Sequence, residues 1–347
     1  MRILIVTDAW FPQVNGVVRT LSVLGNELAR LGHAVDFVTP HRCRTLPCPT
    51  YPEIRLALFA GRAVGRAFED FRPDAVHIAT EGPLGWAARR MCLGRGLPFT
   101  TAFHTKFPDY LHARTRFPRA WSYALLRRFH GAGAGMMVAT ESVRRELADL
   151  GFRNIRRWTR GVDAASFRPG TPLPSLAGLP RPVFLFVGRV AVEKNIQAFL
   201  DADLPGSKLV VGDGPLRPAL EARYPGVRFA GARHGEALAA SYRAADVLVF
   251  PSRTDTFGLV MLEALACGLP VAAYPVPGPL DIVGGSAAGV LDEDLARAAL
   301  AALATDRAAC RAHALRYSWT ACTEMFLANL APFGSDDRAG APARQAG

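Results

Sequence analysis

Short runs rich in Ile, Val and Phe alternate with longer segments of helical periodicity, and this alternation occurs twice along the chain. Such alternation is typical of parallel β-strands covered by helices. The first series predicts strands at residues 2–7, 34–39, 54–58, 75–79, 99–103 and 135–139, and helices at 17–31, 83–93, 119–130 and 142–150. The second series predicts strands at 183–187, 208–211, 227–229, 245–250 and 270–274, and helices at 194–201, 216–224, 235–244 and 258–267.

Each series predicts its own domain. A chain of 347 residues is long enough for two domains of about 150 residues each. The expected fold is therefore α/β, with two Rossmann-like, doubly wound parallel-sheet domains facing each other across a cleft. Because ligands of open α/β sheets bind at the carboxyl ends of the strands, we expect the chemistry at those ends.

The segment "RPGTPLPSLAGLPRP" holds five prolines and little apolar periodicity, which predicts a linker. The expected division is an N-terminal domain at 1–168, a linker at 169–182, a C-terminal domain at 183–316, a last helix at 317–332 and a disordered tail at 333–347.

Positive charge is concentrated in the first half of the chain. Residues 1–165 contain 24 Lys and Arg against 13 Asp and Glu, whereas residues 166–347 contain 17 of each. A compositional preference for Arg explains why there are only three lysines, but not this one-sided placement. The basic half favours a polyanion or an anionic membrane surface. A nucleic-acid partner is not expected, because the chain lacks a nucleic-acid motif and aromatic residues interleaved with the basic clusters.

Cysteine and acid spacing argue against a metal site. The six cysteines form no CxxC pair, which predicts reduced thiols. The short acid pairs Asp201/Asp203 and Asp292/Asp294 lie at predicted helix ends and are not expected to bind metal.

The first ten residues do not resemble a signal peptide, and no window reaches about 18 uncharged apolar residues. We expect a cytoplasmic protein, at most peripheral on the inner face of the cytoplasmic membrane.

Two loops contain candidate phosphate-binding groups. In "VGRVAVEKNI", Arg189 follows a strand and Lys194 opens the next predicted helix, so both cations can converge on a diphosphate. The alternative is a pair of solvated loop cations, which is less favourable for a lysine in the first turn of a helix. In "NGVVRTL", Asn15 and Gly16 precede a helix whose amides could hold an anion or simply form a turn. Neither GxGxxG nor a P-loop is present.

The stretch "SRTDTFGLVMLEALACGLPV" contains an apolar helix with one internal acid, Glu263. A buried carboxylate needs hydrogen-bond donors, which either the protein or a ligand with hydroxyl groups must supply. Asp255 lies before the helix and either caps it or contacts a ligand. The amides that begin this helix could bind a phosphate.

Two further features stand near strand ends. His104 in "TTAFHTKFPDY" follows a strand, and we favour a role in the cleft over simple packing. Gly212 and Gly214 in "VVGDGPLRPALE" turn a strand into a helix, and we interpret them as structural.

Taken together, these motifs resemble retaining glycosyltransferases of the two-Rossmann-domain (GT-B) type, specifically glycosyltransferase family 4. The resemblance rests on "FPQVNGVVRTL", "AFHT", "VGRVAVEKN", "VGDGPLRPALE" and "FPSRTDTFGLVMLEALACGLPVAA", in this order and over nearly the whole chain to about Leu330.

The resemblance implies roles for individual residues. It implies that the donor diphosphate is bound by Gly16, Arg189, Lys194, Gly258, Leu259 and Val260. The donor sugar would be bound by His104, Asp255, Thr256 and Phe257, and the ribose by Glu263. Catalysis would rest on His104 and Asp255, where Asp255 replaces the usual Glu. Asn15, Glu81 and Tyr110 are candidate acceptor residues, and the last helix would cross back to the N-terminal domain.

The expected activity is retaining transfer of a hexose from a nucleoside-diphosphate sugar, GDP-mannose or a UDP-hexose, to an acceptor hydroxyl. Relatives with similar motifs act on lipids as mannosyl-, glucuronosyl- or sulfoquinovosyl-type transferases, so a membrane glycolipid or diacylglycerol is the favoured acceptor. No cofactor and no metal are expected. The alternatives are a soluble-acceptor transferase of the same fold and a Rossmann oxidoreductase, which the missing glycine fingerprint disfavours.

Overall fold

The computed structural model describes residues 1–13, 15–48, 51–176 and 178–334. The chain divides into two compact units. One contains Met1–Thr159 together with the residues after Ala321, and the other contains Arg160–Ala321. The predicted tail lies, from residue 335 on, outside the described residues.

The segment predicted as a linker belongs to the second unit. Leu176 is buried there, and the amide of Leu173 donates to the carbonyl of Ala240 at 3.3 Å. Arg243 also donates a hydrogen bond of 3.1 Å to the carbonyl of Thr171. The proline-rich composition therefore marks an extended segment packed on the second unit, because Leu176 and these hydrogen bonds hold it there.

The first unit is built on a sheet of six parallel strands in the order β2-β1-β5-β6-β7-β8. The strands are β1 (Arg2–Val6), β2 (Ala34–Val38), β5 (Ala75–Ile78), β6 (Thr100–Phe103), β7 (Gly135–Val138) and β8 (Ile155–Arg157). In β1, β5, β6 and β7 nearly every residue is buried, as expected for strands with helices on both faces.

Helices and one hairpin complete the first unit. The helices are α1 (Gly16–Arg30), α2 (Ala60–Phe71), α3 (Pro83–Gly94), α4 (Phe107–Thr115), α5 (Arg119–His130), α6 (Glu141–Asp149) and, from Cys322 on, α14 (Trp319–Asn329), with a 3₁₀ turn at Pro40–Arg42. The hairpin pairs β3 (Arg44–Cys48) with β4 (Tyr51–Leu58). Residues 54–58, predicted as a strand, thus belong to a separate antiparallel pair.

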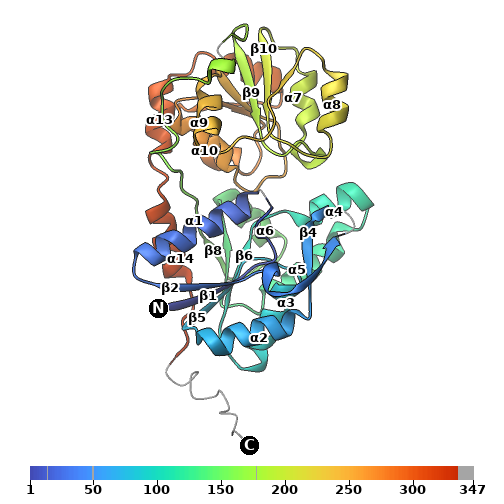
Figure 1. The fold of residues 1–347 in the computed structure, drawn as a ribbon, viewed down its shortest axis with the longest axis vertical. Coiled ribbons are helices and arrows are strands. Elements are labelled where there is room, and N and C mark those ends of the chain that lie inside the picture. The colour runs from blue at the N-terminus through green and yellow to red at the C-terminus, as the bar shows by residue number, and fades with distance from the viewer. Residues whose placement is uncertain (14, 49–50, 177, 335–347) are drawn as a thin grey trace, which may run out of the picture. The chain divides into compact units, whose positions relative to one another are not determined.

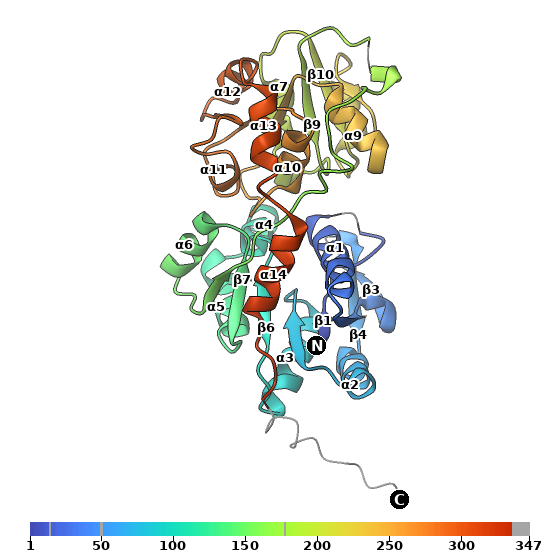
Figure 2. The ribbon, with the colours of Figure 1, turned by 90° about the vertical axis from the view of Figure 1, so that its left-hand side faces the viewer.

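The second unit repeats the parallel design. Its sheet has the order β11-β10-β9-β12-β13-β14 and consists of β9 (Val183–Val187), β10 (Ser207–Val211), β11 (Arg228–Phe229), β12 (Val247–Phe250), β13 (Val271–Ala273) and β14 (Gly289–Leu291). The helices are α7 (Ile196–Asp201), α8 (Arg217–Arg223), α9 (Gly235–Arg243), α10 (Leu259–Ala266), α11 (Pro279–Ile282), α12 (Leu295–Ala302) and α13 (Arg307–Ala314), with 3₁₀ turns at Pro174–Leu176 and Val192–Lys194. In Figure 1, α9, α10 and α13 lie on one side of β9 and β10, and α7 and α8 lie on the other. Figure 2 shows the same layers from the side of α13.

The predicted α/β class with two doubly wound parallel sheets is confirmed. Both cores consist of strand residues facing helices, for example Phe184 and Val210 packed with Phe199 in the second unit. In the first unit Leu4 and Ile78 belong to one such cluster.

Gly212 and Gly214 allow the loop after β10 to pack on the loop after β9. A Cβ on Gly212, where φ is +150°, would lie 1.8 Å from the carbonyl oxygen of Gly188. A Cβ on Gly214 would lie 2.5 Å from the carbonyl oxygen of Val190. The amide of Val190 donates to the carbonyl of Asp213 at 2.9 Å. The structural interpretation of these glycines is therefore supported by close backbone packing.

All six cysteines are free thiols and lie in the described part of the chain. Burial raises the pKa of Cys92 and of Cys267 to about 12. Among the described residues, no helix is long and apolar enough to cross a membrane. Within the same residues, no three His, Cys, Asp or Glu side chains are grouped so that they could hold a metal ion.

Candidate active site

The strand order of the second unit reverses between β9 and β12, which are neighbours although β10 and β11 lie between them in sequence. Ligands of doubly wound sheets bind at such a switch point, beyond the carboxyl ends of the strands. Arg189 and Lys194 follow β9, and Asp255 follows β12. The sheet thus brings three predicted donor residues to the place where a ligand is expected.

Lys194 and Asp255 form an ion pair at this switch point. The Nζ of Lys194 lies 2.5 Å from Oδ1 of Asp255. The neighbouring Asn195 donates from Nδ2 to the carbonyl of Pro251 at 3.0 Å. Both contacts join the loop after β9 to the loop after β12. The cation predicted for the diphosphate and the acid predicted for the sugar are therefore direct partners.

The prediction that Lys194 opens a helix is wrong. Lys194 ends the 3₁₀ turn, and Asn195, with φ of 50°, separates it from α7, which begins at Ile196. Lys194 is therefore not in the first turn of an α-helix, and its positive charge is balanced by Asp255 instead.

Arg189 also has an acidic neighbour. Its Nε lies 3.9 Å from Oε1 of Glu193, whose side chain is largely buried, while the Arg189 side chain is about one-third exposed. Glu193 had no signal in the sequence beyond lying between the two cations. Each predicted cation of the second unit thus has a carboxylate within 4 Å, with which an anionic ligand would compete.

The N-cap of α10 is Gly258, with φ of 96°, which has no side chain that could cap the helix. A Cβ on Gly258 would lie 2.7 Å from the end of Met261, so the tight turn requires glycine. The capping alternative for Asp255 is not borne out, because Asp255 contacts Lys194 instead. The amides of Leu259 and Val260 begin a helix that its own N-cap residue, a glycine, does not cap.

Thr256 and Phe257 lie between Asp255 and the helix. Both are buried, and the ring of Phe257 lies 6.4 Å from that of Tyr317 in an edge arrangement. This packing holds the loop, and their predicted contact with the donor sugar stays a prediction.

Glu263 is only 3 % exposed, as the apolar helix predicted. The hydroxyl of Tyr242 on α9 donates to Glu263 Oε2 at 2.8 Å. The protein therefore supplies at least one of the donors that the buried carboxylate needs. Tyr242 was missed from the sequence, where its only signal was a hydroxyl on the apolar face of a predicted helix.

The first unit has its own switch point, between β1 and β5. Asp8 follows β1 and is buried, and it accepts hydrogen bonds from the hydroxyl of Thr80 at 2.9 Å and from the amide of Leu84 at 2.9 Å. A longer bond of 3.3 Å comes from the amide of Gly85. Asp8 thus caps the N-terminus of α3 from a neighbouring loop. Burial raises the pKa of Asp8 despite these hydrogen bonds.

Glu81, a predicted acceptor residue, stands beside the same switch point. Nε2 of His130 lies 3.1 Å from Oε1 of Glu81, and Nδ1 of His130 lies 2.9 Å from Oγ1 of Thr101. The side chain of His130 is almost fully buried, whereas that of Glu81 is about one-fifth exposed. The carboxylate of Glu81 is therefore oriented by its contact with His130, a residue that the sequence did not single out.

Asn15 is the N-cap of α1. Its Oδ1 accepts hydrogen bonds from the amides of Val17 and Val18, each at 3.0 Å. Two of the first-turn amides that the sequence offered to an anion are therefore satisfied within the chain. Gly16 is the exposed first residue of the helix.

His104 and Tyr110 follow β6. Both are half-buried, and the His104 ring lies 5.6 Å from that of Trp158. The indole of Trp158 donates to the carbonyl of Cys322 at 3.2 Å. The predicted residues of the first unit thus follow the carboxyl ends of β1, β5 and β6 in the chain.

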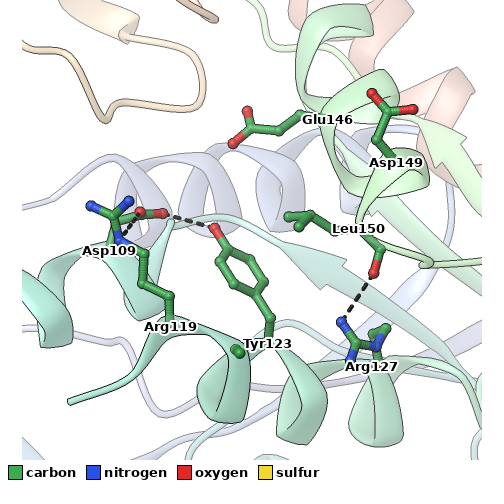
Figure 3. Close-up of a pocket in the computed structure, with 8 residues that line it drawn as sticks. Asp109, Arg119, Tyr123, Arg127, Glu146, Asp149 and Leu150 are labelled. Carbon is green, nitrogen blue, oxygen red and sulfur yellow. Dashed lines mark hydrogen bonds and ion pairs between the residues drawn. The ribbon is translucent and has the colours of Figure 1, made fainter.

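A shallow pocket of about 520 Å³ lies between α4, α5 and α6. It is lined by Asp109, Arg119, Ala120, Tyr123, Arg127, Glu146, Asp149 and Leu150 (Figure 3). Asp109 accepts from the Tyr123 hydroxyl at 2.7 Å and pairs with Arg119 at 3.1 Å. Burial and this carboxylate raise the pKa of Tyr123. None of the predicted site residues lines this pocket.

Two family models match the chain. The model described as Glycosyltransferase Family 4 matches residues 14–166, and the model described as Glycosyl transferases group 1 matches residues 181–306.

Curated proteins are similar over most of the chain. A GDP-mannose-dependent alpha-mannosyltransferase of Mycolicibacterium smegmatis is 31 % identical, over 88 % of this chain and 88 % of that protein. An alpha-monoglucosyldiacylglycerol synthase of Streptococcus pneumoniae is 31 % identical, over 87 % of this chain and 78 % of that protein. The sulfoquinovosyl transferase SQD2 of Arabidopsis thaliana is 28 % identical over 81 % of this chain, which spans only 60 % of that protein's length.

Solved structures share the fold. The sucrose-phosphate synthase of Thermosynechococcus elongatus has a TM-score of 0.77 at 22 % identity, with 94 % of this chain and 97 % of that chain covered. Together with two parallel Rossmann-like sheets, this likeness gives a GT-B fold. The oxidoreductase alternative is excluded by the relatives. The chain belongs to glycosyltransferase family 4 and is a hexosyltransferase.

Proposed function

We propose that the chain transfers a hexose from GDP-mannose or a UDP-hexose to a hydroxyl of a membrane glycolipid or diacylglycerol. The observation that carries the proposal is the position of Arg189, Lys194 and Asp255 at the switch point of the second unit. The printed names of relatives support it, since they include GDP-mannose-dependent transferases, a sulfoquinovosyl transferase and a glucosyldiacylglycerol synthase.

The chemistry follows from charge. When the sugar leaves, the nucleoside diphosphate gains negative charge while the sugar becomes oxocarbenium-like. The charge on the leaving diphosphate is stabilised by Arg189, Lys194 and the positive N-terminal end of α10. The charge on the sugar is stabilised by Asp255. Two fixed cations supply the counter-charge that a metal ion would otherwise provide, so we propose transfer without metal. From the resemblance to retaining transferases of this family, we also propose that the anomeric configuration is retained.

Binding the donor requires an exchange of partners. Lys194 must leave Asp255 to meet the diphosphate, which frees the carboxylate to face the sugar. Asp255 is one methylene shorter than the Glu usual at this position, so the reach of its carboxylate contributes to sugar preference. For the ribose we propose Glu263, whose carboxylate is already oriented by the hydroxyl of Tyr242.

The first unit would supply the acceptor side. Of the candidate acceptor residues, Glu81 has the strongest support, because a buried histidine orients its carboxylate at a switch point. Asn15 has less support as an acceptor residue, since its side chain caps α1. His104 and Tyr110 keep the roles that the family resemblance implies. The basic first half favours an anionic membrane surface, so we propose a peripheral location on the inner face of the cytoplasmic membrane.

A transfer assay tests the function. Purified chain is incubated in detergent micelles with diacylglycerol or a glycolipid, and with GDP-mannose, UDP-glucose or another UDP-hexose, and the lipids are analysed by mass spectrometry. A hexose added to the lipid by the wild type, and not by Arg189→Ala, is expected. Transfer only to soluble sugars would place the acceptor in another class. Absence of transfer from every donor, although UDP or GDP raises the melting temperature, would reject the proposed acceptors.

A further inference from the structure

Helix α5 and the residues before it present an apolar stripe to solvent. The stripe consists of Phe117, Trp121 and Leu125, which follow one another at intervals of four residues. Their exposed fractions are 45 %, 73 % and 53 %. Trp121 is the most exposed of the large hydrophobic side chains in the described residues. Trp121 and Leu125 lie one helical turn apart and therefore share one face of α5.

The stripe does not serve the core. Helix α5 packs on the core through other residues, which include the buried Tyr123, Leu126 and Phe129. The core contact of the helix is thus complete without Trp121 or Leu125. Single exposed apolar residues are ordinary, but a row that includes a tryptophan on a surface helix marks an interaction site.

The surroundings of the stripe are basic. Residues 106–130 contain six Lys and Arg and one acid, Asp109. Asp109 is engaged in the pocket between α4 and α5, where it binds Tyr123 and Arg119 (Figure 3). The acids across this pocket lie on α6, where Glu146 pairs with Lys106 at 2.6 Å. Arg116 and Arg128, which flank the stripe, are exposed.

We propose that the α5 apolar stripe, with Arg116 and Arg128, is the surface by which this chain docks on an anionic lipid bilayer. Trp121 and Leu125 enter the headgroup region, and the arginines contact lipid phosphates. A tryptophan beside arginines is the combination that anchors helices at a membrane interface. The inference deepens the proposed function, on which it rests for a lipid acceptor.

Charge selects the bilayer over a second copy of the chain. Two copies joined through this surface would bring the exposed Arg116 and Arg128 of each copy together, whereas an anionic bilayer offers the opposite charge. Each arginine near such a surface strengthens binding by about fivefold.

Flotation of the full chain with vesicles tests the docking surface. Vesicles are made of equal parts phosphatidylglycerol and phosphatidylcholine, or of phosphatidylcholine alone. The wild type is expected to float with the anionic vesicles at low salt and to be released by high salt. The double variant Trp121→Ser/Leu125→Ser and the double variant Arg116→Glu/Arg128→Glu should each bind at least tenfold more weakly. Leu300→Ser, at a leucine of 43 % exposure in the second unit, is the matched control and should bind as the wild type does.

Fluorescence reports the insertion directly. All five tryptophans lie in the described residues, and only Trp121 is exposed. Anionic vesicles should shift the emission of the wild type to shorter wavelength, and Trp121→Phe should abolish that shift. Thermal melting of the variants should match the wild type, because Trp121 and Leu125 are both exposed.

Transfer in detergent separates the two proposals. The stripe variants should keep transfer to detergent-solubilised lipid and lose it with vesicles. Equal vesicle binding by wild type and stripe variant, or no binding of the wild type at low salt, would overturn the docking surface. A wild-type dimer that the stripe variant dissociates, or retention only by an acidic protein, would also overturn it. Loss of transfer in detergent by the wild type would instead contradict the proposed function.

Discussion

The Nζ of Lys194 lies 2.5 Å from Oδ1 of Asp255, across the two loops that flank the switch point of the second sheet. Both side chains retain some exposure, 26 % and 15 %. A pair of this kind contributes only about 0–1 kcal/mol to stability, so it can be exchanged when a stronger anion arrives. We therefore propose that Asp255 occupies Lys194 until the donor diphosphate takes its place.

Asp255→Asn should separate binding from transfer. The variant removes the carboxylate that competes for Lys194, so UDP or GDP should bind more tightly than to the wild type, by up to about fivefold. Transfer should fall by about a hundredfold, because the charge facing the sugar is lost. Calorimetry gives the first value and steady-state kinetics the second. Weaker diphosphate binding in the variant would show that Asp255 does not compete for Lys194.

Tyr242→Phe should destabilise the second unit by about 1–3 kcal/mol, because it removes a donor from the buried carboxylate of Glu263. Urea unfolding measures the loss. Tyr224→Phe is the control, since its hydroxyl contacts Asp201 at the surface, and it should change stability little. If Glu263 holds the ribose, Tyr242→Phe also raises the KM for the donor. Equal stability of the two variants would mean that the buried hydroxyl contributes nothing specific.

Gly212→Ala should cost about 3 kcal/mol or more, or prevent folding, because its Cβ would meet the carbonyl of Gly188 and its φ of +150° is unfavourable for alanine. Gly226→Ala is the matched control in the same unit, since a Cβ there meets nothing within 4 Å. Thermal melting compares the two. A Gly212→Ala protein as stable as the control would disprove the close approach of the two loops.

Asp8→Asn should change how stability depends on pH. Burial raises the pKa of Asp8 above its ordinary value of 3.8. The stabilisation that this shift supplies is complete below pH 3.8 and is lost as the pH rises through the raised pKa. The unfolding free energy of the wild type, minus that of Asp8→Asn, should therefore fall as the pH rises above 3.8, by at most about 1.4 kcal/mol per pH unit. Urea unfolding of both proteins from pH 4 to pH 7 measures the difference. Parallel curves would indicate that Asp8 titrates normally.

Much of the architecture was predictable from periodicity. The buried strand predicted at residues 183–187 is β9, and that at 75–79 matches β5, because continuous apolar runs leave few other structures. Helix α2 was missed, since "AGRAVGRAFEDF" carries two glycines and follows a residue in left-handed conformation, Phe59. Its helical state depends on packing of Val64 and Ala67 in the core of the first unit.

The site was predictable in its positions and not in its contacts. That Arg189 and Asp255 follow strand ends is visible in the sequence. The pairing of Lys194 with Asp255 spans 61 residues and depends on β9 and β12 being neighbours, which no local pattern reveals. The support of Glu81 by His130 is similarly non-local.

Titration of the wild type and of Lys194→Ala with a nucleoside diphosphate tests the central claim most directly. The ligand is whichever of UDP, GDP and ADP most raises the melting temperature of the wild type. We predict that Lys194→Ala melts within about 2 °C of the wild type, since a partly exposed ion pair contributes little stability. It should nevertheless bind the diphosphate at least tenfold more weakly. Unchanged affinity in Lys194→Ala would contradict the account, because the diphosphate would then lie elsewhere.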